Sequence, residues 1–196
     1  KNSIRLLEIG VQNGGSLETW AKAFPNAELI VGCDIDQKCS SIVWDDARIR
    51  LVVADANKQE GYSKVIEISP SYDVIIDDGS HQSIDILNSF VNYFPLVKPG
   101  GVYVIEDVHA LYLGWGGGLL NSASAHNFFK ALVDVLNFQF WRIRIPINDY
   151  LATFFPSLEV PQFILDGWID SIEFRNSLII LRKSSSPTHQ KLGAQL

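Results

Sequence analysis

Residues 4–16 read IRLLEIGVQNGGS, an apolar run that ends in three closely spaced glycines. The run Ile4–Ile9 has the length and composition of a buried β-strand. Apolar residues then recur at helical spacing at Leu17, Trp20, Ala21 and Phe24. A strand, a glycine loop and a helix in this order are typical of nucleotide-binding α/β folds, in which the loop lets the backbone approach the ligand. The opening of the chain therefore predicts a cofactor site at the end of its first strand.

The alternation of strand and helix continues through most of the chain. Further short apolar runs are predicted strands: Leu29–Cys33, Ile49–Val53, Val74–Ile76 and Val102–Ile105. Helical spacing marks Ile84–Phe94 and Ala125–Leu136, and Lys98–Gly101 is expected to form a turn before the fifth strand. Ile169–Phe174 and Ser177–Leu181 flank a turn and resemble a β-hairpin. We therefore predict a Rossmann-like, doubly wound α/β fold with a mostly parallel seven-stranded sheet and a C-terminal antiparallel hairpin.

The length of 196 residues suits one domain. We assign residues 1–183 to that domain and expect residues 184–196, which open with three serines and a proline, to form a flexible tail. The first predicted strand begins close after Lys1, and the chain contains no methionine. We therefore expect the domain to lack an N-terminal segment of a longer protein.

The bulk composition disfavours several classes of protein. Hydrophobic residues make up 47% of the chain, and no apolar run approaches the roughly 20 residues that span a bilayer. A net charge of −6 disfavours a nucleic-acid partner, because such proteins usually carry a basic surface. Cys33 and Cys39 lack clustered histidines, so we expect two unpaired thiols in a reducing compartment, the cytoplasm.

Acidic residues stand at the ends of successive predicted strands. Asp34 ends the second strand, where a carboxylate can accept hydrogen bonds from both hydroxyls of a ribose. Asp55, at the end of the third, can accept from an adenine amine, and Glu8 and Asp77 can meet the cationic amino-acid end of a ligand. These acids suit a cofactor that carries a sulfonium and an ammonium group but no phosphate.

The glycine loop argues against a dinucleotide-dependent oxidoreductase, because Gln12 interrupts the G-x-G-x-x-G spacing of such enzymes. The ordered motifs instead resemble the class I S-adenosylmethionine-dependent methyltransferases. The resemblance rests on Glu8-Ile9-Gly10 with Gly14, and on the segments 32–36, 54–56 and 96–101. It implies that S-adenosylmethionine is bound by Gly10, Gly14 and Ser16 of the loop and by Glu8, Asp34, Asp55 and Asp77.

A second group of acids follows the fourth and fifth predicted strands. Asp78 ends one strand and Glu106 and Asp107 end its neighbour, so the three carboxylates are expected to converge above the sheet. Without a lysine or arginine between them they repel one another, and a divalent cation relieves that repulsion. Oxygen ligands favour Mg²⁺, with Mn²⁺ or Ca²⁺ as alternatives. Solvated loop acids or helix caps are the other interpretation.

The string from Asp78 to His81, with Glu106 and Asp107, is similar to metal-dependent sugar O-methyltransferases that modify macrolide antibiotics. It is also similar to the family of cephalosporin hydroxylases and rhamnosyl O-methyltransferases. The resemblance implies that Asp78, Glu106 and Asp107 hold the metal and that His81 is the base. Catechol-type enzymes have Asp-Asn where this chain has Glu-Asp, a difference that favours a sugar or glycosylated small molecule as the acceptor.

The expected reaction transfers a methyl group to a hydroxyl oxygen. A metal lowers the pKa of the hydroxyl and aligns its oxygen with the sulfonium methyl, and His81 accepts the proton at neutral pH. Asp78 remains a candidate for accepting that proton. His109, two positions after Asp107, is an alternative base.

The aromatic and glycine-rich segment after the fifth strand is expected to bind the acceptor. Tyr112, Trp115 and Gly116–Gly118 are interpreted as a mobile lid or, alternatively, as a packed surface loop. Two rival functions stay open: a catechol- or phenol-type O-methyltransferase, and a non-catalytic cofactor-binding domain of a larger protein. Homo-oligomerisation is also left open, because sugar-modifying relatives often assemble.

Overall fold

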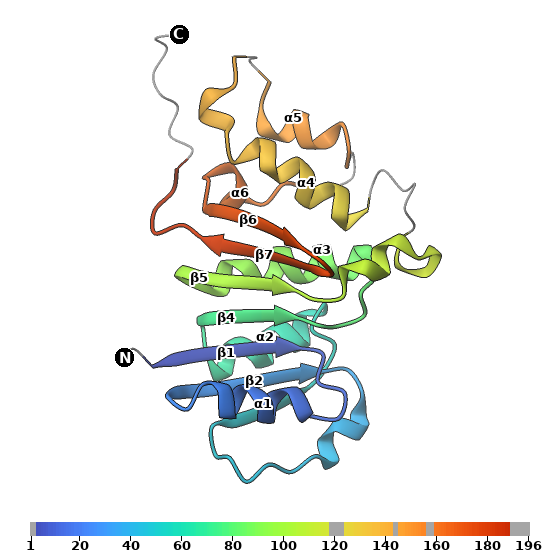
Figure 1. The fold of residues 1–196 in the computed structure, drawn as a ribbon, viewed down its shortest axis with the longest axis vertical. Helices are drawn as coiled ribbons and strands as arrows, with labels where there is room; N and C mark the ends of the chain where they lie inside the picture. Colours follow the sequence, from blue (N-terminus) through green and yellow to red (C-terminus); the bar gives the residue numbers. More distant parts are fainter. Residues whose placement is uncertain (1–2, 118–123, 143–144, 156–158, 189–196) are drawn as a thin grey trace.

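The computed structural model describes residues 3–117, 124–142, 145–155 and 159–188. These residues form one seven-stranded sheet and the helices that cover it (Figure 1). Its strands are β1 (Ile4–Ile9), β2 (Ala27–Asp34), β3 (Ile49–Val53), β4 (Tyr72–Asp77), β5 (Val97–Ile105), β6 (Ile169–Arg175) and β7 (Leu178–Lys183). Their order is β3-β2-β1-β4-β5-β7-β6. β1 to β5 are parallel, whereas β7 pairs antiparallel with β5 and β6. The predicted fold class is confirmed.

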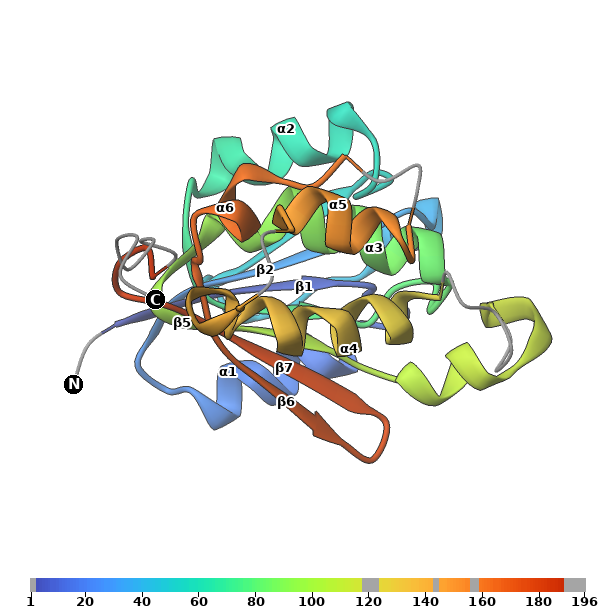
Figure 2. The same ribbon diagram turned by 90° about the horizontal axis from the view of Figure 1, so that it is seen from above.

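Helices cover both faces of the sheet (Figure 2). The α-helices are α1 (Gly15–Ala23), α2 (Gln59–Ile68), α3 (Ser83–Tyr93), α4 (Ala125–Val135), α5 (Ile147–Ala152) and α6 (Gln162–Leu165). Short 3₁₀ helices are η1 (Gln37–Ser41), η2 (Phe94–Leu96), η3 (Val108–Tyr112), η4 (Gly114–Gly116) and η5 (Phe138–Phe140). α1 lies on one face, and the other α-helices lie on the opposite side.

The buried core is divided by the sheet into two clusters. Neighbouring strand residues point to opposite faces, so Leu6 packs with Leu17 of α1, whereas Leu7 packs with Val65 of α2 and Phe90 of α3. All five side chains are fully buried. Apolar burial on both faces explains why the parallel strands read as nearly continuous apolar runs.

One predicted boundary is wrong. Residues 98–101 belong to β5, which begins at Val97, and are not a turn before it. Gly100 has φ +79°, and a Cβ at Gly101 would lie 2.6 Å from the Asp73 carbonyl oxygen, so the two glycines let an irregular strand stay against β4. Between β2 and β3, Cys39 lies in the five-residue 3₁₀ helix η1, which the Asp36 side chain caps.

The C-terminal end of the described chain packs on the domain as far as Thr188. Ser184 is buried and donates its backbone N–H to the carbonyl oxygen of Trp168, and Thr188 donates to that of Gly167. The remainder of the expected tail, residues 189–196, and Gly118 of the expected lid lie outside the described residues. None of the helices described is long and apolar enough to cross a bilayer.

Candidate active site

A cavity of about 640 Å³ opens at the carboxyl ends of the parallel strands. Its wall contains many of the predicted site residues: Glu8, Gly10, Ser16, Asp34, Asp55, Asp78, His81 and Asp107. Gly14, Asp77 and Glu106 do not belong to the wall. Residues that the sequence did not single out also line it, among them Asn13, Ile35, Asp36, Asn57 and Asp85. The cavity lies where open α/β sheets bind ligands, and its size is that of a small-molecule site.

Gly10 and Gly14 of the glycine loop are required for different structural reasons. Gly10 has φ +92°, and a Cβ there would lie 2.1 Å from the carbonyl oxygen of Asp78. It therefore lets the ends of β1 and β4 approach each other beneath the cavity. Gly14 has φ +80° and caps α1, and its added Cβ would meet the Trp44 ring at 2.6 Å. Gly14 is thus constrained by packing.

Asp34 holds the glycine loop in place. Its Oδ2 accepts hydrogen bonds from the backbone N–H groups of Val11 (2.7 Å) and Gln12 (2.9 Å), and its Oδ1 accepts from Asp36 (2.7 Å). Burial opposes ionisation, but these N–H donors outweigh it and lower the pKa of Asp34. An ionised carboxylate has about four acceptor positions, so Asp34 keeps capacity for a ligand hydroxyl.

Glu8 is a buried carboxyl group on the α1 side of the cavity. It is 1% exposed and accepts hydrogen bonds from the Ser16 hydroxyl and the Trp20 indole. Burial raises the pKa of Glu8 to about 7, although both hydrogen bonds act in the opposite direction; the charges of Asp78 and Glu106 raise it further. Glu8 is therefore poised to gain or lose its proton near neutral pH.

The Glu8 pKa predicts a pH-dependent stability. Because the folded-state pKa of about 7 exceeds the ordinary glutamate pKa of 4.5, the folded state holds the proton more tightly than the unfolded state, and stability falls as pH rises between these values. At ~1.4 kcal/mol per pH unit, the loss of unfolding free energy amounts to roughly 3 kcal/mol. Glu8→Gln should remove this component, because a neutral amide can still pair with Ser16 and Trp20. Urea denaturation at pH 5 and pH 8 checks it; equal pH slopes for parent and variant would contradict it.

Asp55 follows β3 and Asp77 ends β4, two strands that β2 and β1 separate, and the two acids face different surroundings. Asp55 lines the cavity, and its Oδ1 accepts from the backbone N–H of Asn57 (2.9 Å). Asp77 is 4% exposed and accepts from the Tyr103 hydroxyl (3.3 Å) and the Gly79 N–H (3.4 Å). Burial raises the pKa of Asp77 to about 7. The predicted contact of Asp77 with a cofactor therefore has no support from its position.

Asp78, His81 and Asp107 form a compact cluster at the cavity mouth. Each offers one ligand atom, and these atoms lie within 4.8 Å of one another. His81 Nε2 is 3.9 Å from Asp78 Oδ1 and 4.0 Å from Asp107 Oδ2. The pKa of Asp78 is raised chiefly by burial and also by the charge of Asp107, whereas His81 acts in the opposite direction. The cluster thus joins the ends of β4 and β5, as the sequence predicts for Asp78 and Asp107.

Glu106 occupies a different position from the one expected of a third metal ligand. It is half-buried, its N–H donates to the Asp77 carbonyl oxygen at 2.9 Å, and it is not a member of the compact cluster. Burial raises the pKa of Glu106, and so do the charges of Asp78 and Asp107. Glu106 thus belongs to the electrostatic environment of the cluster, and its role as a ligand stays a prediction.

Two members of the cluster have left-handed backbone conformations. His81 has φ +57° and Asp107 has φ +50°, values that non-glycine residues seldom adopt. Backbone strain of this kind persists where the surrounding structure determines the conformation, and it is frequent at functional sites. The imidazole and the carboxylate are therefore presented by constrained turns at the ends of two neighbouring strands.

The segment after β5 is folded into the 3₁₀ helices η3 and η4, which the sequence did not predict. Within this segment Val108 and Leu111 are buried, whereas Tyr112 and Trp115 are about half exposed. His109 is exposed, and its Nδ1 lies 3.7 Å from Asp107 Oδ1. The segment therefore combines buried apolar residues with exposed aromatic rings.

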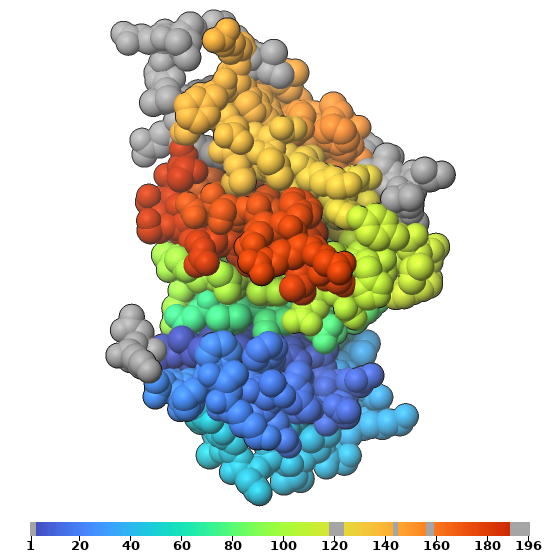
Figure 3. Space-filling view, in the orientation of Figure 1, coloured from blue at the N-terminus to red at the C-terminus, as the bar shows by residue number. Residues whose placement is uncertain are grey.

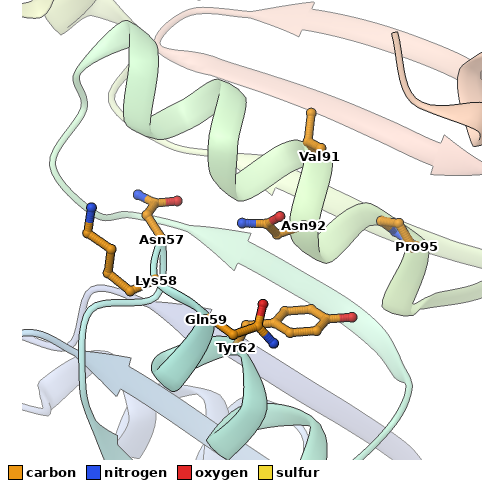
Figure 4. Close-up of a pocket in the computed structure, with 7 residues that line it drawn as sticks. All are labelled: Asn57, Lys58, Gln59, Tyr62, Val91, Asn92 and Pro95. Atoms are coloured by element: carbon orange, nitrogen blue, oxygen red, sulfur yellow. The ribbon is translucent and has the colours of Figure 1, made fainter. Parts of the chain in front are cut away.

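A second cavity, of about 420 Å³, lies between α2 and α3 (Figure 4). Its wall is built from Asn57, Lys58, Gln59, Tyr62, Val91, Asn92 and Pro95. None of the predicted site residues lines it. Asn57 also lines the larger cavity, so the two hollows adjoin at the end of β3.

The fold and this acid-lined cavity define a class I methyltransferase domain. The family model described as "Methyltransferase domain" matches residues 7–108, and the chain belongs to that family. It is 36% identical over 147 residues to mycinamicin VI 2''-O-methyltransferase of Micromonospora griseorubida, covering 69% of this chain and 36% of that protein. It is 32% identical over 144 residues to 8-demethyl-8-alpha-L-rhamnosyl tetracenomycin-C 2'-O-methyltransferase of Streptomyces olivaceus, covering 69% and 37%.

Solved structures show the same likeness. MycE methyltransferase from the mycinamycin pathway, in complex with Mg and SAH, has a TM-score of 0.76 and 28% identity over 96% of this chain and 46% of that one. A MycE complex with Mg, SAH and mycinamycin VI gives a TM-score of 0.74 and 29% identity, over 93% and 45%. The chain spans less than half the length of the relatives it matches. The predicted resemblance to sugar-modifying methyltransferases is confirmed.

Proposed function

We propose that this chain carries the catalytic domain of an S-adenosylmethionine-dependent, divalent-metal-assisted O-methyltransferase that acts on a sugar hydroxyl of a glycosylated small molecule. The observation that carries the proposal is the convergence of Asp78, His81 and Asp107 at the mouth of an acid-lined cavity. The named relatives modify sugars of macrolides and a tetracenomycin, which supports a saccharide acceptor.

The cavity residues fit S-adenosylmethionine. Among the described residues, Asp34 and Asp55 form no ion pair with a cationic side chain, so both can accept hydrogen bonds from the ribose hydroxyls and the adenine amine. Glu8 supplies a buried carboxyl group that a cationic amino-acid end would keep ionised. The cavity volume of about 640 Å³ is adequate for a cofactor of this size.

The mouth residues fit a hard divalent cation. Asp78 and Asp107 offer carboxylate oxygens, and their mutual repulsion is one cause of the raised Asp78 pKa. A cation would relieve that repulsion, and oxygen donors favour Mg²⁺. Asp78, Asp107 and Glu106 would hold it, since all three follow the ends of β4 and β5 and their charges act on one another.

The chain's own residues orient the acceptor and move its proton. When bound, S-adenosylmethionine supplies the methyl group and the cation lowers the pKa of the acceptor hydroxyl. Asp78, Asp107 and His81 line the same cavity, so an acceptor hydroxyl bound at the two carboxylates would lie beside the imidazole. The His81 side chain is 22% exposed, and its Nε2 lies about 4 Å from both carboxylates. This nitrogen accepts the hydroxyl proton. The carboxylates then stabilise the imidazolium that forms.

The surroundings of the site bear on the acceptor and the location of the enzyme. Tyr112 and Trp115 expose flat aromatic surface in the segment that follows Asp107, which suits a sugar ring. Cys33 and Cys39 are free and buried, which supports a cytoplasmic location.

The proposal also includes assembly into a homo-oligomer. It includes no nucleic-acid partner and no membrane partner.

Cofactor binding should depend on the Asp34 carboxylate. We expect Asp34→Asn to weaken S-adenosylmethionine binding by ~5-fold to ~100-fold, since an amide offers fewer acceptors and leaves a ribose hydroxyl or a loop N–H unpaired, at about 1–3 kcal/mol. Isothermal calorimetry with the 196-residue chain measures this.

The control for this experiment is Asp45→Asn, which neutralises an exposed carboxylate outside the cavity wall. It should bind S-adenosylmethionine like the parent. Equal affinity of parent and Asp34→Asn, or comparable binding of NADH, would show that the cofactor is misassigned.

A further inference from the structure

The turn between β6 and β7 reaches the candidate active site. Arg175 pairs with Leu178, so the turn consists of Asn176 and Ser177. β7 is antiparallel to β5, and Ile179 pairs with Ile105, the last residue of β5. The turn therefore lies next to the carboxyl end of β5, where Asp107 follows the strand (Figure 1). In the space-filling view the hairpin adjoins the segment that follows β5 (Figure 3).

Ser177 makes three contacts with this segment. Its carbonyl oxygen accepts a hydrogen bond from the Val108 N–H at 3.2 Å. Its hydroxyl Oγ lies 2.7 Å from His109 Nδ1 and 3.5 Å from Asp107 Oδ1. A residue some seventy positions away in the sequence therefore contacts both the acid of the cluster and the histidine next to it.

The two carboxylate oxygens of Asp107 face different groups. Oδ1 faces Ser177 and His109, whereas Oδ2 faces His81 at 4.0 Å. We propose that Ser177 is a positioning residue of the active site, whose hydroxyl holds Asp107 Oδ1 and so directs Oδ2 into the cluster. The inference rests on the proposed function insofar as the cluster binds a cation.

The hydroxyl also fixes the tautomer of His109. A serine hydroxyl has one hydrogen to donate, and Asp107 Oδ1 can only accept when ionised. When Ser177 donates to Asp107, its Oγ accepts from a protonated His109 Nδ1. In the neutral imidazole this arrangement selects the tautomer with the proton on Nδ1. Ser177 thereby orders a short chain of hydrogen bonds from His109 to Asp107.

The backbone conformation of the turn does not require serine at position 177, so the hydroxyl group is the distinctive contribution of this residue. Ser177 has φ +64°, a conformation that glycine adopts without strain. The hairpin is held independently, since the His126 ring lies between Tyr112 of η3 (5.2 Å) and Phe174 of β6 (5.9 Å). Replacing Ser177 by glycine should therefore keep the turn and lose only the hydroxyl contacts.

The test compares Ser177→Gly with Asn176→Ala, a change in the same turn at an exposed side chain. We expect Ser177→Gly to keep or raise the melting temperature, to shift the His109 ring ¹⁵N signals in NMR spectra, and to weaken Mg²⁺ binding to the S-adenosylhomocysteine-loaded protein by about tenfold. Asn176→Ala should change neither the ring signals nor the Mg²⁺ affinity.

Parental ring signals and parental Mg²⁺ affinity in Ser177→Gly would overturn the inference. A parent that binds no Mg²⁺ at all would instead overturn the proposed metal-assisted function. In that event the ring signals alone decide the role of Ser177: a shift in Ser177→Gly but not in Asn176→Ala supports positioning, and unchanged signals reject it.

Discussion

Asp107→Asn and Asp78→Asn should each abolish most Mg²⁺ binding and, with it, methyl transfer. The two carboxylates supply two of the three groups that meet within 4.8 Å, so an amide at either position removes a charged ligand from an open site. Losing even the partner behind a metal ligand costs about 10–100-fold in affinity, and losing the ligand should cost at least that much. Calorimetry with Mg²⁺ and a methyl-transfer assay on a glycosylated macrolide measure the two effects.

Removal of the metal should have the same result as these substitutions. Protein treated with EDTA should lose methyl transfer and regain it when Mg²⁺ is added, while S-adenosylmethionine still binds through Asp34 and Asp55. Asp45→Asn, whose carboxylate is exposed and outside the cavity wall, serves as the charge-matched control. Parental activity in EDTA would contradict the metal and leave an enzyme that relies on acid–base chemistry alone.

The strands and their terminal acids could be predicted because both follow from local sequence. An apolar run between turn residues predicts a buried strand, and parallel strands bring their carboxyl ends to one edge. These two rules predict Asp34, Asp55, Asp78 and Asp107 at one edge of the sheet, and all four line the larger cavity. Asp77 is the last residue of β4 and accepts a hydrogen bond from Tyr103 in the core, whereas Asp78 follows the strand. The alternation of strand residues between the two faces is the local signal for this burial, and the contact of Asp77 with a cofactor stays a prediction.

Other features of the site depend on contacts between distant residues and have no local signal. Trp20 and Ser16 hold Glu8 from α1, and Ser177 contacts Asp107 from a hairpin near the end of the chain. The irregular start of β5 contains proline and glycine, which normally indicate a turn, so the sequence predicts a turn at residues 98–101. Here the pairing of β5 with β4 overrides that local preference.

His81→Asn should slow the chemical step by about 10²–10⁴-fold while leaving both ligands bound, because a general base contributes to rate and little to ground-state affinity. Asparagine is the suitable replacement, since residue 81 has φ +57° and asparagine tolerates the left-handed region better than most residues. The change also preserves a polar side chain next to Asp78. Single-turnover transfer to the sugar acceptor measures the step without interference from product release.

His109→Asn provides the matched comparison, because His109 also approaches Asp107 but is anchored to Ser177 through Nδ1. We expect it to slow transfer much less than His81→Asn, since His81 Nε2 faces both carboxylates of the cluster. Raising the pH should partly restore His81→Asn, because hydroxide can then take the acceptor's proton. If His109→Asn is the slower variant, the base lies in the segment after β5. If neither variant is slowed, Asp78 is the remaining acceptor of the proton and the histidine assignment is wrong.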